Sequence, residues 1–409
     1  MRLPFEKRET IILVALLLFS LIVRILLFPL PGAKGDLSTY AAWFNAASEH
    51  GIRVFYNVVW SDYPPFNVYL FWAFGSLAKQ LSLSETSLVY LIKLLPTLFD
   101  TATVFLIFTF VRKRFDFKTS LLTAALYAFN PAVIFDSAIW GQFDAIYTFF
   151  LLLSLMLLLD SKPKLSAVAF TMGILTKPQS IALAPLIAFL ILRKHGWRSL
   201  LTSLLAATAT IFAVILPFEW SNPITFLSNI YFGAYGGYAV TTANAFNLWA
   251  LGGLWQPDTP LLLIAGWVMF GILTAFILYV LHKRLDTSGE LLILFSAFML
   301  FFGFFMLPTR IHERYLFPAL SVLALMLPFS KKIRPIYGAL TFTCLANQAY
   351  VLHFLNTLQS IPFEVVWTVT LINLAVFLFA LMLMPTTLQG KKLGQVQPSQ
   401  RSGKNQLEG

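Results

Sequence analysis

The chain has 409 residues, of which 58% are hydrophobic and only 11% are charged, and its mean hydropathy is +0.77. A soluble protein would carry about a quarter charged residues, so this composition excludes an ordinary soluble domain and predicts a polytopic membrane protein. The net charge of +11 does not indicate nucleic-acid binding, because Lys and Arg gather on the cytoplasmic loops of membrane proteins. Cys344 is the only cysteine, so no disulfide can form within the chain.

Apolar runs long enough to cross or enter a bilayer recur along most of the chain. The fold class predicted from them is an all-α polytopic membrane protein with about twelve transmembrane helices. One transmembrane domain covers residues 1–386, and the polar, basic segment 387–409 is expected to be a disordered cytoplasmic tail. The predicted spans lie near residues 10–30, 88–111, 119–137, 143–159, 165–176, 180–192, 199–218, 260–281, 290–307, 315–329, 335–355 and 364–386.

Residues 66–82 are apolar but short, and the distribution of charge decides how they are interpreted. If this segment lies in the membrane interface instead of spanning, most Lys and Arg residues fall on cytoplasmic segments, as the positive-inside rule requires. Both termini are then cytoplasmic. Residues 31–87 and 219–259 become the two long outer loops, and the first loop carries amphipathic interfacial helices.

Two further segments, 165–176 and 180–192, are too short to span alone. At 1.5 Å per residue they reach roughly 18–20 Å, whereas the hydrocarbon core is about 30 Å thick. Their shared apex, residues 176–180, is therefore expected to lie below the outer surface, against protein or a wet cavity. Broken helices of this kind often mark binding sites in membrane proteins, and Lys177 would lie in the cavity wall.

Asp36 lies in the first outer loop, directly after Gly35. Two roles remain open for its carboxylate. One is a helix N-cap, which favours Asp, and the other is a general base at the membrane boundary. The two roles are compatible, because a helix N-terminus would also hold the carboxylate in place.

Two short polar segments allow both a structural and a functional interpretation. Asp62-Tyr63-Pro64-Pro65 has Pro where a helix would begin, and Asp62 and Tyr63 are also candidates for contact with substrate. The turn at residues 140–144, Trp-Gly-Gln-Phe-Asp, is ordinary for a connection between spans. Its Trp140, Gln142 and Asp144 would equally offer acceptors and a ring face to a sugar.

The run Arg310-Ile311-His312-Glu313-Arg314-Tyr315 is the densest charged segment on the predicted outer side. Arg suits phosphate because its planar fork donates two bonds at once, although contact with phospholipid headgroups is the alternative. The structural alternative for Glu313 is an ion pair with one of the two Arg residues of this run. In the middle of two spans, Arg24 and Asp100 are predicted to form a structural ion pair. The sequence has no Asp-x-Asp and no His/Cys cluster with ligand spacing, so neither a metal nor a cofactor is predicted.

Taken together, these motifs resemble the GT-C superfamily of integral-membrane glycosyltransferases that use polyprenyl-phosphate sugars, and most of all prokaryotic relatives of the dolichyl-phosphate-glucose and dolichyl-phosphate-mannose transferases. The resemblance is carried by Gly35-Asp36, residues 62–65, residues 140–144, Lys177-Pro178-Gln179, Asn244-Ala245-Phe246-Asn247-Leu248-Trp249 and residues 312–315. It implies that Asp36 is the catalytic base and that Arg310, His312 and Arg314, with Lys177, bind the donor phosphate. Residues expected to bind substrate are Asp62, Tyr63, Trp140, Gln142, Asp144, Gln179, Asn244 and Glu313.

The chain departs from two branches of this superfamily. Leu37 follows Asp36, where protein O-mannosyltransferases usually have Glu, and their soluble lumenal domain is absent. The metal-binding acidic motifs of oligosaccharyltransferases are also absent. These departures favour a glycan or lipid-linked acceptor over a protein, which is left as a second option.

The function expected is therefore transfer of a hexose, mannose or glucose, from a polyprenyl-phosphate donor to an acceptor hydroxyl. The reaction would be inverting and metal-independent, on the extracytoplasmic side of the cell membrane, with membrane lipids as further partners and no nucleic acid. The alternative is a polytopic transporter or a flippase for lipid-linked sugars. A secondary transporter would usually show paired repeats, and none is found. A non-catalytic scaffold is a third interpretation, for which buried polar groups would be a needless cost.

Overall fold

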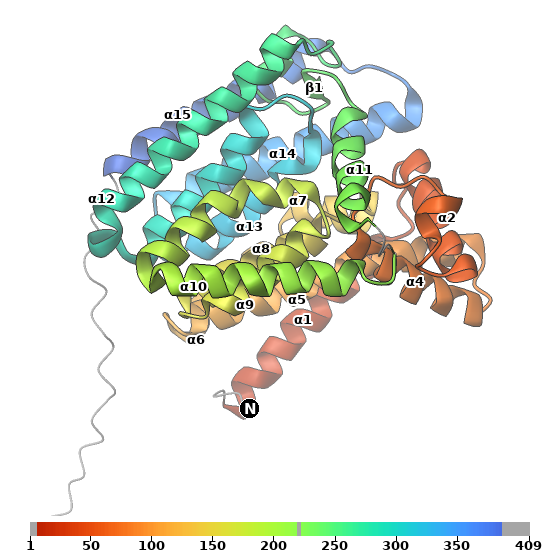
Figure 1. Cartoon of the computed structure of the whole chain (residues 1–409), viewed down its shortest axis with the longest axis horizontal. Coiled ribbons are helices and arrows are strands. Elements are labelled where there is room, and N and C mark those ends of the chain that lie inside the picture. Colours follow the sequence, from red (N-terminus) through yellow and green to blue (C-terminus); the bar gives the residue numbers. More distant parts are fainter. Residues whose placement is uncertain (1–5, 219–221, 387–409) are drawn as a thin grey trace, which may run out of the picture.

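The computed structural model describes residues 6–218 and 222–386, which form a bundle of helices with a helical layer on one side (Figure 1). The predicted tail, 387–409, lies outside the described residues, as does the beginning of the predicted outer loop 219–259. Apart from two strands of two residues each, all regular structure in the described residues is helical. The all-α fold class is confirmed.

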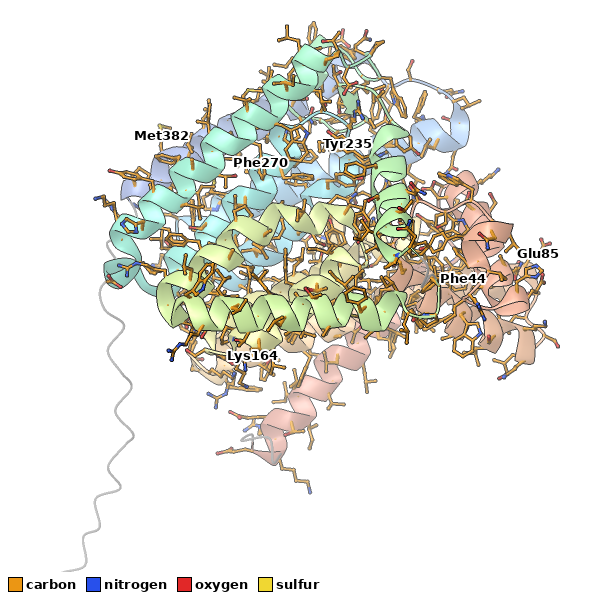
Figure 2. The ribbon with its side chains drawn as sticks, in the orientation of Figure 1. Phe44, Glu85, Lys164, Tyr235, Phe270 and Met382 are labelled. Atoms are coloured by element: carbon orange, nitrogen blue, oxygen red, sulfur yellow. The ribbon has the colours of Figure 1, made fainter. Side chains whose placement is uncertain are left out.

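The layer on one side is built from the first predicted outer loop. After α1 (Lys7–Leu27) the chain forms α2 (Lys34–His50), α3 (Phe55–Val58) and α4 (Pro65–Gln80), and α2 packs against α4. Aromatic rings fill the space between them: the ring centroids of Phe44 and Phe71 lie 5.3 Å apart. Figure 2 shows Phe44 inside this layer and Glu85 at its margin.

The central bundle follows in sequence order. Helices α5 (Glu85–Arg112) and α6 (Phe117–Ala128) pack together, as do α8 (Asp144–Leu159), α9 (Pro163–Ile174) and α10 (Ala184–Ile215). Between α6 and α8 the chain bends by 46° into α7 (Pro131–Ile134) and a π-helical segment, η1 (Phe135–Trp140). Asn130 caps α7 and Pro131 is its first residue. This Asn-Pro pair explains the bend, since Pro cannot continue the preceding helix.

The C-terminal half closes the bundle and includes the second predicted outer loop. Helix α11 (Pro223–Gly236) stands between the α2–α4 layer and the rest of the bundle (Figure 1). The two short strands, β1 (Thr242–Ala243) and β2 (Ile311–His312), pair in parallel, with Ala243 opposite His312. The pairing brings two loops together although their sequences are far apart. The other elements are η3 (Leu248–Gly252), α12 (Pro260–Met306, broken at Gly289), η4 (Glu313–Leu316), α13 (Phe317–Met326), α14 (Ile333–Thr357) and α15 (Phe363–Thr386).

The described helices that are long enough to cross a membrane are fewer than the twelve spans predicted from the sequence. All twelve predicted segments are helical over most of their length. Six helices in the described part are long and apolar enough to cross a membrane, or seven if the bent pair around Asn130 counts as one span. The chain is thus a multi-pass membrane protein, and the count of about twelve crossings stays a prediction. Helix α4, which covers the ambiguous segment 66–82, has only 16 residues and is not among the six.

The predicted ion pair in the middle of the bundle is present. Arg24 Nε lies 3.5 Å from Asp100 Oδ2, and both side chains are fully buried. Asp100 also accepts hydrogen bonds from the hydroxyl groups of Tyr127 and Ser137. Burial of two charges is tolerable only with partners of this kind. The pair joins α1 to α5 and to η1, which carries part of the site described next.

Candidate active site

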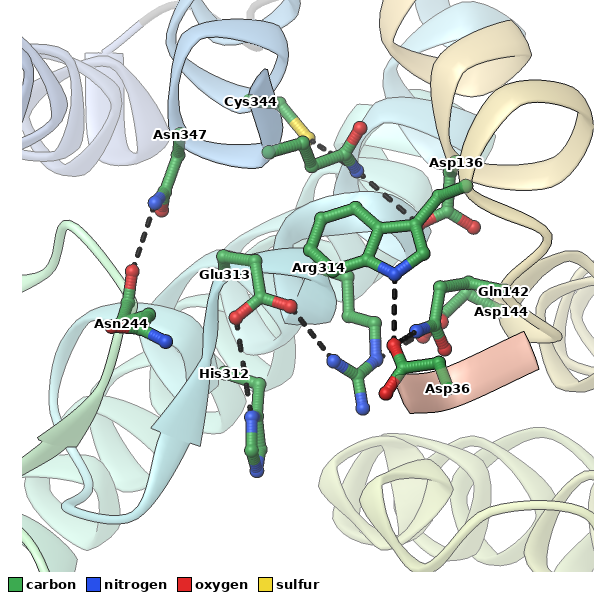
Figure 3. A network of polar contacts seen from close by, with 12 residues as sticks. Asp36, Asp136, Gln142, Asp144, Asn244, His312, Glu313, Arg314, Cys344 and Asn347 are labelled. Carbon is green, nitrogen blue, oxygen red and sulfur yellow. Dashed lines mark hydrogen bonds and ion pairs between the residues drawn. The ribbon is translucent and has the colours of Figure 1, made fainter. Parts of the chain in front are cut away.

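The Asp36 carboxylate is held by two side chains that come from the connection between η1 and α8. Its Oδ2 atom accepts hydrogen bonds from Trp140 Nε1 at 2.8 Å and from Gln142 Nε2 at 2.7 Å (Figure 3). Helix α2 begins at Lys34 with Ala33 as its N-cap. Asp36 is therefore the third helical residue, and the N-cap alternative is wrong.

Local backbone geometry explains why this contact forms. Gly141 ends the π-helical segment at φ +89°, a left-handed conformation that glycine adopts without strain. The turn that follows sends Gln142 toward α2. Gly32 lies against the same turn, and a Cβ atom on it would come within 2.5 Å of the Trp140 carbonyl oxygen. Glycine at position 32 therefore permits the close approach that places Asp36 beside Trp140. π-helical segments are frequent at functional sites.

A tyrosine one turn beyond Asp36 sets the orientation of Gln142. Tyr40 donates a hydrogen bond from its hydroxyl group to Gln142 Oε1 at 2.8 Å. With its oxygen engaged in this way, the Gln142 amide presents its NH₂ group to Asp36. Neither Tyr40 nor its role was anticipated from the sequence, although its position four residues after Asp36 would place it on the same helix face.

A second carboxylate, Asp144, is the centre of a buried charge cluster. It is the first residue of α8 and is fully buried. Its Oδ2 atom lies 2.9 Å from Lys177 Nζ and 3.5 Å from Arg314 Nε. The cluster thus joins α8, the α9–η2 apex and η4, three parts of the chain that the sequence placed on one side of the membrane.

The neighbouring run at residues 312–314 contributes further charges. Arg314 donates to Glu313 Oε1 at 2.7 Å, and His312 Nδ1 lies 4.0 Å from Glu313 Oε2. The predicted pairing of Glu313 with an Arg is present. Burial raises the pKa of Glu313. Burial, together with the positive charges of Arg314 and Lys177, holds the pKa of His312 well below its ordinary value. At neutral pH His312 is therefore a neutral imidazole.

These charges border a cavity of about 500 Å³, called the main cavity below. Its charged lining residues, and the neutral His312, are buried or half-buried; the charged residues are Asp62, Lys177, Arg310 and Arg314. By contrast, Ile181, Phe232 and Trp267 line it with exposed apolar side chains. The cavity therefore extends from a shielded charged end to an apolar opening. The apex Lys177-Pro178-Gln179 lies in its wall, as the short broken helices predicted.

Arg310 lines the main cavity, and its positive charge already faces a carboxylate. Its guanidinium lies 2.8 Å from Asp258 Oδ2 through Nε and donates to the Tyr235 carbonyl oxygen at 3.1 Å. The hydrogen bond to Asp258 raises the pKa of Arg310. Sequence reasoning missed Asp258, although it lies in the same predicted outer loop as the strand that pairs with the Arg310 segment.

Comparison with known proteins decides the family. Residues 60–308 match glycosyltransferase family 87. The chain belongs to glycosyltransferase family 87. The resemblance to membrane glycosyltransferases that the sequence motifs indicated is thereby confirmed, and the protein is a family 87 enzyme. The matched range begins after Asp36 and ends before Arg310, so both lie outside it.

Comparisons with curated proteins and with solved structures leave the assignment to family 87 unchanged. No curated protein matches it. The crystal structure of the Archaeoglobus fulgidus oligosaccharyltransferase in the apo form is similar, with a TM-score of 0.38 and 15% sequence identity. The similarity covers 93% of this chain and 56% of that one, so the chain spans about half the length of that protein.

The structure separates the residues predicted for the site into two groups. Asp62, Tyr63, Lys177, Gln179, Arg310, His312 and Arg314 line the main cavity. Asp36, Trp140, Gln142, Asp144 and Glu313 do not line it, and they form the hydrogen bonds and ion pairs given above, some of them with the lining residue Arg314. Asn244 lines neither described cavity but forms an antiparallel backbone bridge with His312; its Oδ1 atom accepts a hydrogen bond from Trp255 and its carbonyl oxygen accepts one from Asn347. Within residues 6–218 and 222–386, no three His, Cys, Asp or Glu side chains meet as a metal site would require.

Proposed function

We propose that this protein transfers a hexose, mannose or glucose, from a polyprenyl-phosphate donor to a hydroxyl group of a glycan or lipid-linked acceptor. The shape of the main cavity carries this proposal. A polyprenyl-phosphate sugar has a long apolar tail and an anionic, hydroxyl-rich head. A cavity with an apolar opening and a shielded charged end matches both parts in one space.

The cationic residues of the charged end suit the donor phosphate. Lys177, Arg310 and Arg314 line the cavity, and each already faces a carboxylate. Held in this way, the cations are ordered before the donor binds, which lowers the cost of organising them. Negative charge grows on the phosphate as it leaves, so cations that contact it stabilise the transition state. His312, being neutral, offers the phosphate a hydrogen bond and no additional charge.

Asp36 is the proposed base. The two hydrogen bonds that it accepts both end on Oδ2, and among the described residues Oδ1 accepts none. Oδ1 is thus available to take the proton of the acceptor hydroxyl as that oxygen attacks the anomeric carbon. A single displacement with one base inverts the anomeric configuration. Asp62, Tyr63 and Gln179, which line the cavity, are proposed to contact the sugar.

The proposed orientation follows the distribution of basic residues in the sequence. About twelve crossings with both termini cytoplasmic would place the layer α2–α4 and the main cavity on the extracytoplasmic side. The reaction needs no metal in this scheme, because a phosphate leaves without protonation and the cations face it directly.

The test uses purified protein in nanodiscs with radiolabelled polyprenyl-phosphate mannose or glucose and extracted membrane glycolipids as acceptors. We expect Asp36→Asn to lower the rate of transfer by a factor of about 10²–10⁴, the usual contribution of a general base, with donor binding retained. The matched control, Glu49→Gln, also neutralises a carboxylate of α2, but one that is exposed and lines neither cavity, and it should leave the rate near its wild-type value. Transfer by Asp36→Asn at the wild-type rate would refute the base assignment. Movement of intact donor across a proteoliposome membrane without transfer would instead support a flippase.

A further inference from the structure

A second cavity, of about 300 Å³, lies beside the main cavity and has no role in the scheme above. Its volume lies near the lower limit of small-molecule pockets, which range from about 300 to 1,000 Å³. It is lined by Tyr56, Trp60, Ser61 and Asp62 of the first outer loop and by four residues of α11. Asp62 lines both cavities. A ligand in the second cavity therefore reaches the same carboxylate as the donor sugar in the main cavity.

Helix α11 separates the two cavities. The residues that it contributes to the second cavity, Phe226, Asn229, Ile230 and Gly233, recur at three- and four-residue spacing and so form one face of the helix. Tyr231 and Tyr235 lie on the opposite face and line the main cavity. One helix thus forms a wall of each cavity, and Asp62 lies where the two meet.

The backbone at the rim of the second cavity accepts hydrogen bonds from two aromatic side chains, Trp43 and the lining residue Tyr56. Trp43 Nε1 donates to the Trp60 carbonyl oxygen at 2.7 Å, and the Tyr56 hydroxyl donates to the Tyr63 carbonyl oxygen at 2.6 Å. The Trp60 ring itself is 71% exposed. The backbone is therefore ordered, while a large aromatic face is left uncovered.

The chemistry of this lining favours a carbohydrate. Burial raises the pKa of Asp62, and among the described residues its carboxylate forms no ion pair. Hydroxyl groups are the donors that satisfy such a carboxylate without adding charge. The Trp60 ring offers an apolar face, and Asn229 offers both a donor and an acceptor. A sugar ring presents hydroxyl groups at its edge and C–H groups on its faces, so it complements all three.

We propose that the second cavity is the acceptor subsite. It binds the terminal sugar of a glycan acceptor so that a hydroxyl group of that sugar extends past Asp62 into the main cavity. This inference rests on the proposed function. It assigns the two substrates to opposite faces of α11, with the donor on the Tyr231 side and the acceptor on the Gly233 side.

Gly233 allows a test that does not endanger the fold. A Cβ atom added at Gly233 meets nothing within 4 Å, and Leu favours a helix more than Gly does. The Cβ atom of Gly233→Leu therefore meets no neighbour, and the rest of its side chain takes up space in the second cavity, which Gly233 lines. The matched control is Gly236→Leu, since Gly236 is in the same helix, also has nothing within 4 Å, and lines neither cavity.

Saturation-transfer NMR on protein in nanodiscs measures the binding of mannobiose and maltose. Binding of the donor is measured separately with radiolabelled polyprenyl-phosphate mannose. We expect Gly233→Leu to weaken disaccharide binding roughly tenfold, with donor binding unchanged and Gly236→Leu like wild type. Trp60→Ala, which keeps the carbonyl oxygen bound by Trp43, should weaken disaccharide binding roughly five- to tenfold. Its control, Trp197→Ala, removes a ring of similar exposure, 68%, outside both cavities.

The outcomes separate this inference from the proposed function. If wild type transfers hexose but Gly233→Leu binds the disaccharides as wild type does, the subsite is refuted and the function stands. If Gly233→Leu loses donor and disaccharide binding equally, the subsite is also refuted. If the variant loses disaccharide binding alone while wild type transfers no hexose, the subsite stands and the proposed function fails.

Discussion

The indole Nε1 of Trp140 lies 2.8 Å from Oδ2 of Asp36, although the two residues are 104 positions apart in the sequence. The contact joins the first turn of α2 to the end of a π-helical segment in the central bundle. It holds the carboxylate that we propose as the base in one orientation.

Trp140→Phe tests the positioning role of the indole. Phe keeps an aromatic ring at this fully buried position but removes the N–H donor, so Asp36 keeps only the bond from Gln142. We expect kcat to fall about tenfold while donor KM stays near its wild-type value, since the loss affects orientation and not binding. Steady-state kinetics with labelled donor measure both. A larger effect on donor KM than on kcat would contradict the positioning role.

The buried pair of Asp144 and Lys177 should make a large contribution to stability when only one partner is removed. Asp144→Asn leaves the Lys177 ammonium group buried without its nearest anion, and breaking such a pair typically costs about 3–5 kcal/mol. We expect the thermal unfolding temperature in detergent to fall clearly. Arg314 keeps Glu313 as a partner, so the loss should come mainly from Lys177.

The double variant Asp144→Asn/Lys177→Met tests that explanation. Because no uncompensated charge remains at position 177, much of the lost stability should return. Equal unfolding temperatures for the single and double variants would show that the ion pair is not the cause.

Arg310→Met should weaken donor binding, because it removes a cation from the charged end of the main cavity. A charge-assisted hydrogen bond to phosphate contributes about 1.5–3 kcal/mol, so donor affinity should fall roughly tenfold or more. Arg53→Met removes an exposed charge from the first outer loop, outside both cavities, and should have no effect. If Arg310→Met weakened acceptor binding more than donor binding, the phosphate role would be ruled out.

Acceptor binding should depend on pH through Asp62. Burial raises the pKa of this carboxyl, so the neutral form persists to higher pH than in an exposed aspartate. Protonation removes the negative charge that strengthens the hydrogen bond donated by the sugar hydroxyl. The affinity for mannobiose should therefore be highest well above this pKa and fall as the pH is lowered through it.

In Asp62→Asn the same titration should be flat and weak, because the amide does not ionise in this range. Saturation-transfer NMR across the pH series gives both curves. An identical decline in wild type and in Asp62→Asn would exclude Asp62 as the titrating group.

Two kinds of feature were predictable from the sequence. One depends on the free-energy cost of placing a charge in lipid, and the other depends on the length that a helix needs to cross the bilayer. The Arg24–Asp100 pair is one, because isolated charges at that depth are expensive. The cavity wall at Lys177 is another, because two helices too short to span must leave their apex below the surface. The number of crossings was less accessible, since broken and bent helices satisfy the same apolar patterns as full spans.

Residue pairings inside the site were not predictable in this way. The sequence grouped Asp144, Lys177 and Arg314 on one side of the membrane but could not show that one carboxylate faces both cations. It assigned Arg310 to phosphate without its counter-ion Asp258. Contacts at 3 Å depend on the relative rotation and depth of helices, which local patterns do not encode.

The sequence by itself determined that this is an all-helical membrane protein with a polar first loop, because composition and hydropathy reflect transfer between water and lipid residue by residue. Only the tertiary structure decided that Asp36 is the third residue of a helix and not its cap, and that Trp140 and Gln142 hold it. Only the packing of α11 showed that its two faces border different cavities. The physical reason is that burial is a property of each segment, whereas a site is a set of distances between segments that packing alone fixes.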